Sequence, residues 1–357
     1  MDSFFIHYID SHISMRTKTD IVIIGGGPAG LTLAKFLAEE SVDFILLEED
    51  KTFYKKPCGE GITAGLCGYD FFDLYESRTG IERITETFII KMTPGEIELP
   101  FTNIQVNKGE VEADLARQAQ SHGAEIRMGE KVKDLVRKEN SLLVLPQNIE
   151  AKIAVGADGF NSIVRRSMGI KKPGYFGVAS TGYWTGEPPG DACIFEFKKS
   201  VAKHGYAWWF PRKNDWNIGI GTVRPRSFRQ QLDNFKKRYP EIKDWRTSTV
   251  PLSRPLRSHG KNSILVGDSA SQVVSVFADG ILPSMICARK AAEVLVKFSG
   301  NGFKNADLSQ YEKAWRSVLG KTFNDGYYLH RIMMGLYFSE TLLYKFLQFT
   351  GRHYQYT

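Results

Sequence analysis

The segment from Asp20 to Glu48 constrains the fold of this chain more than any other stretch. It reads DIVIIGGGPAGLTLAKFLAEESVDFILLE. Four consecutive β-branched residues, 21–24, predict a short buried strand, and the turn after them has the spacing G-x-G-x-x-G. A helix over 29–39 and a second strand over 43–47 are expected to follow. This order is typical of a dinucleotide-binding unit, so we expect a Rossmann-like α/β fold.

The glycines of this turn have separate physical tasks. Gly25 makes the tight turn, Gly27 lets the backbone approach a pyrophosphate, and Gly30 lets the helix lie close to the strand. Pro28 and Ala29 open the helix, whose free N–H groups and positive dipole end would face the phosphates.

Glu48 ends the second strand, at roughly the 20-residue separation expected of the carboxylate that binds the adenosine ribose. A glycine-rich turn without a ligand would account for the glycines alone. It would not account for the strand before them, the helix after them and this acid, so we predict a dinucleotide site.

Composition limits what else the chain does. Its 357 residues suffice for one large domain and a second, at roughly 150 residues per domain. The net charge of +7 would suit an anionic membrane surface or substrate, but no basic run concentrates it. We therefore interpret the charges as solvated faces and expect no nucleic acid partner.

Four cysteines, Cys58, Cys67, Cys193 and Cys287, lack metal-ligand spacing, so we expect no metal and a reducing, cytoplasmic compartment. The N-terminal extension, residues 1–18, is too short and too interrupted by polar residues to be a signal or spanning segment. Met15 is an alternative start. No run of about 20 apolar residues predicts a membrane span.

A loop reading KPCGEG, residues 56–61, follows the second strand. Its proline and glycines fix an unusual backbone around the Cys58 thiol. The thiol either faces a redox centre or is a small buried residue in a turn, and composition leaves both open. Residues 84–98, with a turn at 93–95, predict a β-hairpin outside the nucleotide domain.

Two further elements pair a buried strand with a glycine and an acid. An amphipathic helix with Val111, Leu115 and Ala119 on one face is predicted first, followed by a strand into Val132. Strands at 142–145 and 151–155 then lead into GADGFNSIVR. Here Asp158 precedes Gly159, although an ordinary Asx-type turn with Ser162 near a helix start would explain this stretch alone.

The third element, ILVGDSA from residue 264, is a buried strand that we expect to stop at Gly267 and Asp268. A long apolar helix opens soon after it, at Gly280 and Ile281. A carboxylate at a strand end can hydrogen-bond a sugar-alcohol hydroxyl, and a helix N-terminus can stabilise negative charge on a reduced ring.

The order GGGPAG, GADGFNSIVR, VGDSA and DGI resembles the FAD-dependent hydroxylase and reductase flavoproteins. KPCGEG and GYAWWFP, residues 205–211, further resemble the geranylgeranyl reductase family. That family's tunnel motif, Tyr-x-Trp-x-Phe-Pro, is matched by Tyr206, Trp208, Phe210 and Pro211. The resemblance covers residues 20–291 and implies FAD as the cofactor.

The resemblance also implies roles for individual residues. Cofactor contacts beyond the first turn and Glu48 are expected at Cys58, Gly59, Lys108, Val132, Asp158, Gly159, Gly267, Asp268, Gly280 and Ile281. Cys58, Tyr206 and Trp208 are the candidate catalytic residues, and Tyr206, Trp208, Phe210 and Pro211 are the candidate substrate residues. Whether Cys58 supplies a proton or only packs beside the flavin stays open.

Four positions depart from the family pattern. Lys203 replaces a proline of the tunnel motif, and Lys108 replaces an arginine, which weakens a bidentate pyrophosphate contact. Ser275 and Ala278 stand where a proline and a glycine are common before the DGI turn.

The substrate region lies between the second and third elements. Strands are predicted at 193–197, 206–210 and 216–223, with a turn at 212–215, and a charged helix at 227–239. Alternation along the strand puts Tyr206, Trp208 and Phe210 on one face and Trp209 on the other. A core cluster is the common explanation of such aromatics, but here one face would line a pocket over the flavin.

We therefore expect an α/β protein with α+β character. A discontinuous FAD-binding domain would comprise 19–80, 106–168 and 255–300, and an inserted antiparallel-sheet substrate domain would comprise 81–105 and 169–254. A C-terminal helical region, 301–357, either caps the protein or rests on lipid; we favour the cap.

The expected function is an FAD-dependent reductase that saturates isoprenoid C=C bonds, such as the geranylgeranyl groups of lipid precursors or archaeal-type membrane lipids. NAD(P)H or a ferredoxin would supply electrons to a monomer in the cytoplasm, with peripheral contact at the inner face of the membrane. The alternatives are a monooxygenase of the same superfamily and a non-catalytic isoprenoid-binding flavoprotein.

Overall fold

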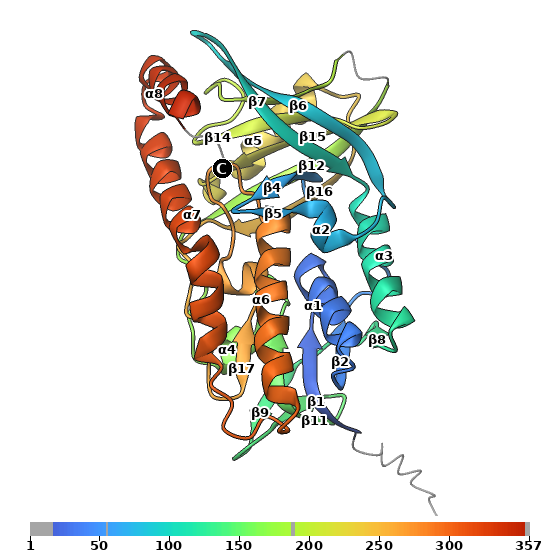
Figure 1. Ribbon diagram of the computed structural model, residues 1–357. Coiled ribbons are helices and arrows are strands. Elements are labelled where there is room, and N and C mark those ends of the chain that lie inside the picture. Colours follow the sequence, from blue (N-terminus) through green and yellow to red (C-terminus); the bar gives the residue numbers. More distant parts are fainter. Residues whose placement is uncertain (1–16, 55, 187–189, 354–357) are drawn as a thin grey trace, which may run out of the picture.

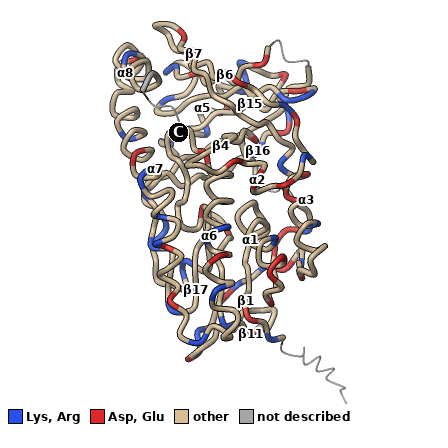
Figure 2. The backbone as a smooth tube through the Cα atoms, in the orientation of Figure 1, with Lys and Arg blue, Asp and Glu red and all other residues tan. Residues whose placement is uncertain are grey.

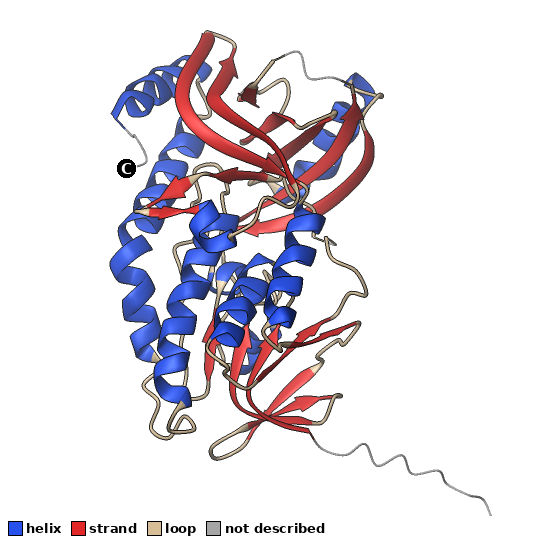
Figure 3. Ribbon diagram, turned by 45° about the vertical axis from the view of Figure 1, so that its right-hand side comes forward, coloured by secondary structure: helices blue, strands red, loops and turns tan. Residues whose placement is uncertain are grey.

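The computed structural model describes residues 17–54, 56–186 and 190–353. Two large sheets lie at opposite ends of the molecule, with helices between them and along one side (Figure 1 and Figure 3). Most of the expected N-terminal extension, including Met15, lies outside the described residues. Its last two residues, Thr17 and Lys18, instead begin the first strand and pair with Ile149 and Glu150.

The first sheet contains the predicted nucleotide-binding unit. Its strands are β1 (Thr17–Ile24), β2 (Phe44–Glu48), β8 (Glu125–Met128), β9 (Asp134–Arg137), β10 (Leu142–Leu145), β11 (Ile149–Gly156) and β17 (Ser263–Leu265). The order is β8-β2-β1-β11-β10-β9, with β17 also paired to β11. The pairs among β8, β2, β1, β11 and β17 are parallel, whereas β9 and β10 join antiparallel.

One predicted strand end is wrong, and a second lies close to the observed end. The strand expected to lead into Val132 stops at Met128, because Gly129 turns the chain with φ +76°, and Val132 lies in the following loop. The strand expected to stop at Gly267 and Asp268 is β17, which ends at Leu265, just before them. Gly267, with φ +71°, there begins a 3-10 turn, η1 (Gly267–Ala270).

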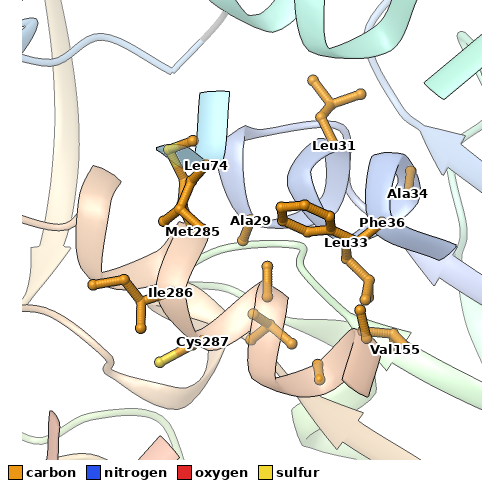
Figure 4. Packing of buried hydrophobic residues seen from close by; sticks show 14 of the residues in the cluster. Ala29, Leu31, Leu33, Ala34, Phe36, Leu74, Val155, Met285, Ile286 and Cys287 are labelled. Atoms are coloured by element: carbon orange, nitrogen blue, oxygen red, sulfur yellow. The ribbon is translucent and has the colours of Figure 1, made fainter. Parts of the chain in front are cut away.

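Helices α1 (Pro28–Glu39), α3 (Lys108–Ser121), α4 (Ile163–Ser167) and α6 (Ile281–Ser299) accompany the first sheet. In Figure 4, Leu33 of α1 lies near Val155 of β11, while Ile286 and Cys287 of α6 lie on the other side of the same cluster. All four side chains are fully buried, and they belong to the largest apolar cluster of the described residues. This packing fixes the N-termini of α1 and α6 relative to the strand ends.

The second sheet has the order β16-β12-β15-β14-β13-β6-β7-β3. Its strands are β3 (Gly61–Thr63), β6 (Ile81–Met92), β7 (Gly95–Val106), β12 (Phe176–Thr185), β13 (Ala192–Glu196), β14 (Gly205–Pro211), β15 (Asp215–Thr222) and β16 (Lys243–Pro251). Both predicted hairpins are confirmed, as β6–β7 and β14–β15. One pair, β13 with β6, is parallel, and the other pairs are antiparallel.

Smaller elements lie between the two sheets or against the second sheet (Figure 1). They are the two-stranded β4 (Gly65–Leu66) and β5 (Tyr69–Asp70), the short helix α2 (Phe71–Tyr75), and the predicted charged helix α5 (Pro225–Arg238). The α/β class is confirmed. The exact domain division remains a prediction, and β3, which that division assigns to the FAD-binding part, pairs with β7 in the second sheet.

The C-terminal region forms α7 (Ser309–Leu336) and α8 (Glu340–His353), and α7 runs along one side of the molecule from one sheet to the other (Figure 1). Trp315 and Phe323 of α7 pack in the largest cluster, while Met333 and Leu343 pack against the second sheet. The helices therefore cap the protein, as we favoured. Within the described residues no helix is long and apolar enough to cross a membrane.

Charged residues are spread over the chain. Figure 2 shows Lys and Arg interspersed with Asp and Glu rather than gathered in one segment. The positive net charge of +7 is therefore distributed, which agrees with the interpretation as solvated faces.

Candidate functional site

A cavity of about 880 Å³ is lined by residues of both sheets, which is within the range of ligand-binding pockets. The predicted site residues that line it are Gly25, Gly27, Pro28, Ala29, Glu48, Cys58, Gly59, Lys108, Val132, Asp158, Gly159, Tyr206, Trp208, Phe210, Gly267, Asp268, Gly280 and Ile281. Gly30 and Pro211 are not among the lining residues. The fold thus brings together segments that are more than 200 residues apart in the sequence.

The glycine-rich turn has the geometry of a cradle. A Cβ atom on Gly25, which has φ +109°, would lie 2.4 Å from the carbonyl oxygen of Ala157, and one on Gly30 would lie 2.0 Å from that of Gly25. A Cβ on Gly27, by contrast, would meet no atom within 4 Å, because this residue faces open space. No side chain caps α1 at Gly27, so its first N–H groups stay available to an anion.

Glu48 secures this turn. Its Oε2 accepts a hydrogen bond from the Gly26 N–H at 2.5 Å, and its Oε1 accepts one from the Asp50 N–H at 2.9 Å. Burial raises the pKa of Glu48, although both backbone donors oppose that rise. The carboxylate lines the cavity while holding the turn, which is consistent with its expected place beside a ribose.

Asp158 lines the cavity but directs one carboxylate oxygen elsewhere. Its Oδ2 accepts hydrogen bonds from the N–H groups of Ile163 at 2.6 Å and Val164 at 3.4 Å, at the start of α4. Ser162 caps the same helix through the Arg165 N–H at 2.9 Å. The side chains of this stretch therefore form the Asx-type turn and helix start that its sequence also allowed. Asp158 Oδ1 is buried and has no hydrogen-bond partner in the described structure.

Lys108 lies at the first position of α3 and is buried. Its Nζ lies 2.5 Å from Glu112 Oε1, and its backbone N–H donates to Glu60 Oε1 at 2.9 Å. Burial alone would lower the pKa of Lys108, but Glu112, Cys58 and Glu60 together more than offset it, so the pKa is raised. The ammonium that we expected near a pyrophosphate is thus already paired within the chain.

The KPCGEG loop reaches the third cofactor element. Lys56 forms an ion pair with Asp268, which lies in η1 next to the N-terminus of α6. No side chain caps α6 at Gly280, and both Gly280 and Ile281 line the cavity. This 19-residue helix therefore points an uncapped positive end at the cavity.

Cys58 carries a neutral thiol in this loop. Its Sγ accepts a hydrogen bond from the Glu60 N–H at 3.2 Å. Burial raises the pKa of Cys58 to about 11, against the lowering effect of Lys108. A thiol with this pKa is a weak acid and a poor nucleophile near neutral pH.

Beneath the loop lies a buried hydrogen-bond network that our sequence analysis missed. Glu60, which is 1% exposed, accepts at Oε2 from Tyr183 Oη at 2.7 Å, Arg212 Nη1 at 2.6 Å and Asn217 Nδ2 at 3.0 Å. Asn217 also donates to the Cys58 carbonyl at 3.1 Å. An acid between the two glycines of this loop was the available signal, but its partners come from distant strands and a hairpin turn of the second sheet.

The aromatic face of β14 is confirmed. Tyr206, Trp208 and Phe210 belong to the cluster that lines the cavity, whereas Trp209 packs on the other face of the sheet against Phe235 of α5. Four further aromatic side chains that we did not predict extend the same wall: Phe88, Phe101, Phe195 and Phe277. They come from other strands and a loop, and no local pattern marked them.

Trp208 is fixed from two sides. Its indole Nε1 donates to Asn217 Oδ1 at 2.9 Å, and its ring lies over Gly219 of β15. A Cβ on Gly219 would lie 1.9 Å from Trp208 Cζ2. The indole is therefore held in one orientation by a hydrogen bond and by a strand without a side chain beneath it.

These features fit FAD. The glycine cradle and Glu48 suit the adenosine and pyrophosphate half, while the KPCGEG loop, Asp268 and the N-terminus of α6 suit the ribityl and flavin half. Within the described residues no cluster of His, Cys, Asp or Glu could hold a metal ion, and all four cysteines are free.

Comparison with known proteins agrees with this geometry. A family profile described as an FAD binding domain matches residues 18–185. A digeranylgeranylglycerophospholipid reductase 2 from Methanococcoides burtonii is 27% identical over 343 residues, which cover 87% of this chain and 83% of that protein. The FAD cofactor and the resemblance to the geranylgeranyl reductase family are thereby confirmed.

Solved structures share the fold. A geranylgeranyl bacteriochlorophyll reductase-like protein from Thermoplasma acidophilum has a TM-score of 0.79 at 18% identity, covering 92% of this chain and 90% of that chain. PqsL, a probable FAD-dependent monooxygenase from Pseudomonas aeruginosa, has a TM-score of 0.69 at 13% identity, covering 93% and 100%. At these identities the likeness concerns the fold, which reductases and monooxygenases have in common.

Proposed function

We propose that this FAD-dependent flavoprotein, similar over most of its length to digeranylgeranylglycerophospholipid reductases, is a reductase of isoprenoid C=C bonds. The observation that supports this most is the continuity of one cavity from the glycine cradle to the aromatic wall of Tyr206, Trp208 and Phe210. The substrate class is a geranylgeranyl group carried by a membrane lipid or its precursor. We propose the same site residues as those expected from the sequence, except Gly30 and Pro211, which act in packing.

FAD, when bound and reduced, supplies hydride equivalents. The chain's own residues hold an apolar substrate against the ring and exclude water from it. Aromatic pairs such as Phe195 with Phe277, whose ring centroids are 4.8 Å apart, and Phe195 with Phe210, at 5.2 Å, make a rigid apolar wall. Such a wall suits an isoprenoid better than a polar aromatic substrate, since few of its groups could hydrogen-bond a hydroxyl.

The partners follow from this assignment. We propose NAD(P)H or a ferredoxin as the electron donor and a monomer as the working form. We also propose peripheral contact with a membrane, because Tyr328, Ile332, Phe338 and Leu342, on and between α7 and α8, expose 46–69% of their surface. An apolar face of this kind can rest in the interfacial region while the rest of the cap stays packed.

An anaerobic turnover tests the function. The purified protein would be reduced with dithionite and mixed with a geranylgeranylated glycerolipid or geranylgeranyl diphosphate. We expect flavin reoxidation together with products that are heavier by pairs of hydrogen atoms, measured by mass spectrometry. A flavin that stays reduced until air is admitted, followed by hydroxylated products, would favour a monooxygenase. A colourless protein that retains lipid but no FAD would favour the non-catalytic alternative.

A further inference from the structure

Asp279 stands out among the cavity residues that the proposed site has not used. It lies in the loop before α6, where reciprocal backbone hydrogen bonds with Val274, 2.8 and 3.1 Å long, close a tight turn. Its carboxyl Oδ2 accepts a hydrogen bond from Thr63 Oγ1 at 2.5 Å. Its Oδ1 is buried and accepts no hydrogen bond of normal geometry from the described residues, although the Ile281 backbone N–H acts on the carboxyl from the start of α6. Thr63 therefore anchors one oxygen, and the other oxygen can carry a proton.

The acid lies where the two halves of the cavity meet. Asp279 precedes Gly280 and Ile281 at the N-terminus of α6, and it follows Phe277 of the aromatic wall. The pKa of Tyr206 in that wall is raised mainly by burial and secondly by the Asp279 carboxylate, so this carboxylate lies close enough to act on the Tyr206 hydroxyl. A proton on Asp279 therefore lies between the proposed flavin site and the proposed substrate site.

Four other cavity side chains that carry a proton are poorer proton donors than Asp279, because of their hydrogen bonds or their pKa values. Tyr206 Oη donates to the Phe277 carbonyl at 2.9 Å, and Trp208 Nε1 donates to Asn217. Cys58, with a pKa of about 11, is a much weaker acid than a carboxyl. His330, which also lines the cavity, has its pKa lowered to about 4 by burial, so its neutral ring is a poor donor.

The surroundings of Asp279 favour its neutral form. Burial raises its pKa to about 6, and the Thr63 hydroxyl and the Ile281 backbone N–H oppose that rise only in part. The groups facing it from other elements are Thr63 on β3 and Tyr206 on β14; the nearby Asp268 is ion-paired with Lys56. An acid with a pKa near the working pH is well matched to proton transfer.

We propose that Asp279 is the catalytic acid that protonates the alkene carbon left without hydride. This rests on the proposed reductase function. In the balanced step one alkene carbon would take the hydride that bound, reduced FAD supplies. As the π bond breaks, its electron pair would take the O–H proton of Asp279 and form the C–H bond at the other carbon. Asp279 is left as a carboxylate and regains its proton from water.

Single-turnover kinetics test this assignment. Reduced wild-type protein would be mixed anaerobically with a geranylgeranylated lipid, and flavin reoxidation would be followed from about pH 5 to about pH 8. Because the protonated form is the donor, the wild-type rate constant is expected to fall about tenfold per pH unit above about 6. Asp279→Asn should lose at least about 100-fold and the pH dependence with it.

A spectroscopic readout separates this role from a structural one. The oxidised protein should show a carboxylic acid C=O infrared band that titrates near pH 6 and is missing in Asp279→Asn, while the flavin spectrum and FAD affinity stay unchanged. Asp191→Asn, at an 84% exposed carboxylate, is the matched control and should keep the band and the wild-type rate. Cys58→Ser should keep the pH slope.

Three outcomes would overturn the assignment. Wild-type rates in Asp279→Asn would remove Asp279 as the acid while leaving the reductase function intact. Loss of the pH slope in Cys58→Ser, but not in Asp279→Asn, would assign the proton to the thiol. A wild-type protein that saturates no alkene would remove the proposed function and this inference together.

Discussion

Replacement of Glu60 by glutamine tests whether the buried network holds the KPCGEG loop in place. The substitution keeps the shape of the side chain and leaves the backbone, which has φ +57° at this position, equally strained. It removes the charge that faces Arg212 at 2.6 Å. It also puts an amide NH₂ or a single carbonyl oxygen where Oε2 accepts from three donors and Oε1 from the Lys108 N–H.

The expected cost can be estimated from these contacts. Breaking a buried ion pair by removing one partner costs roughly 3–5 kcal/mol. Arg212 keeps two weaker anionic neighbours, with Asp215 at 3.1 Å and Glu82 at 3.4 Å, so we expect the lower end, about 3 kcal/mol of unfolding free energy. That is a large share of the roughly 5–15 kcal/mol by which a typical domain is stable.

Urea denaturation at a fixed FAD concentration would measure the difference, since bound cofactor adds to apparent stability. Glu86→Gln, at an exposed position on β6, is the matched control and should change the unfolding free energy by less than about 0.5 kcal/mol. We also expect weaker FAD binding in Glu60→Gln, because Asn217 would lose a partner that helps it hold the Cys58 carbonyl. An unfolding free energy within 0.5 kcal/mol of wild type, at an unchanged denaturant slope, would refute the reasoning.

Three further predictions concern single positions. Gly219→Ala should destabilise the protein by roughly 1–3 kcal/mol and weaken isoprenoid binding, because its Cβ would lie 1.9 Å from the Trp208 indole. In urea unfolding Gly221→Ala should have a smaller effect, since the nearest contact of its Cβ would be 3.3 Å away. Gly25→Ala should lower stability as well as FAD affinity, whereas Gly27→Ala should leave unfolding unchanged and lower only the affinity in a fluorescence titration. Iodoacetamide should label Cys58 at pH 8 at least 100-fold more slowly than free cysteine, and the labelling rate should rise about tenfold per pH unit. Peptide mass mapping would measure both, and rapid labelling at pH 8 would contradict the raised pKa of Cys58.

The regular elements were largely predictable from the sequence because they depend on local periodicity. The strand and helix around the glycine-rich turn, the two hairpins and the opposite orientations of Trp208 and Trp209 all follow from spacing along the chain. The one wrong strand end, before Val132, has a local cause too. Gly129 takes a positive φ value, but a glycine in a sequence does not by itself reveal whether it does so.

The contents of the cavity were predictable where a motif marked them and not elsewhere. Tyr206 and Trp208 were found because they share a motif, whereas Phe88 and Phe195 were missed because they lie on other strands. Lys108 was expected at a phosphate, yet it pairs with Glu112 one helical turn away. Side chains three or four residues apart on a helix face the same side. The sequence alone therefore indicated that Glu112 competes with a phosphate for the Lys108 ammonium.

By itself the sequence determined the FAD-binding fold, the cofactor and the aromatic face of β14. These depend on backbone turns, periodicity and motifs that act over a few residues. Only the tertiary structure decided which distant groups meet. It placed Arg212 and Asn217 on Glu60, Gly219 under Trp208, and Asp279 against Thr63. Their hydrogen bonding and burial, which set charge and acidity at the site, arise from packing between elements that no local pattern encodes.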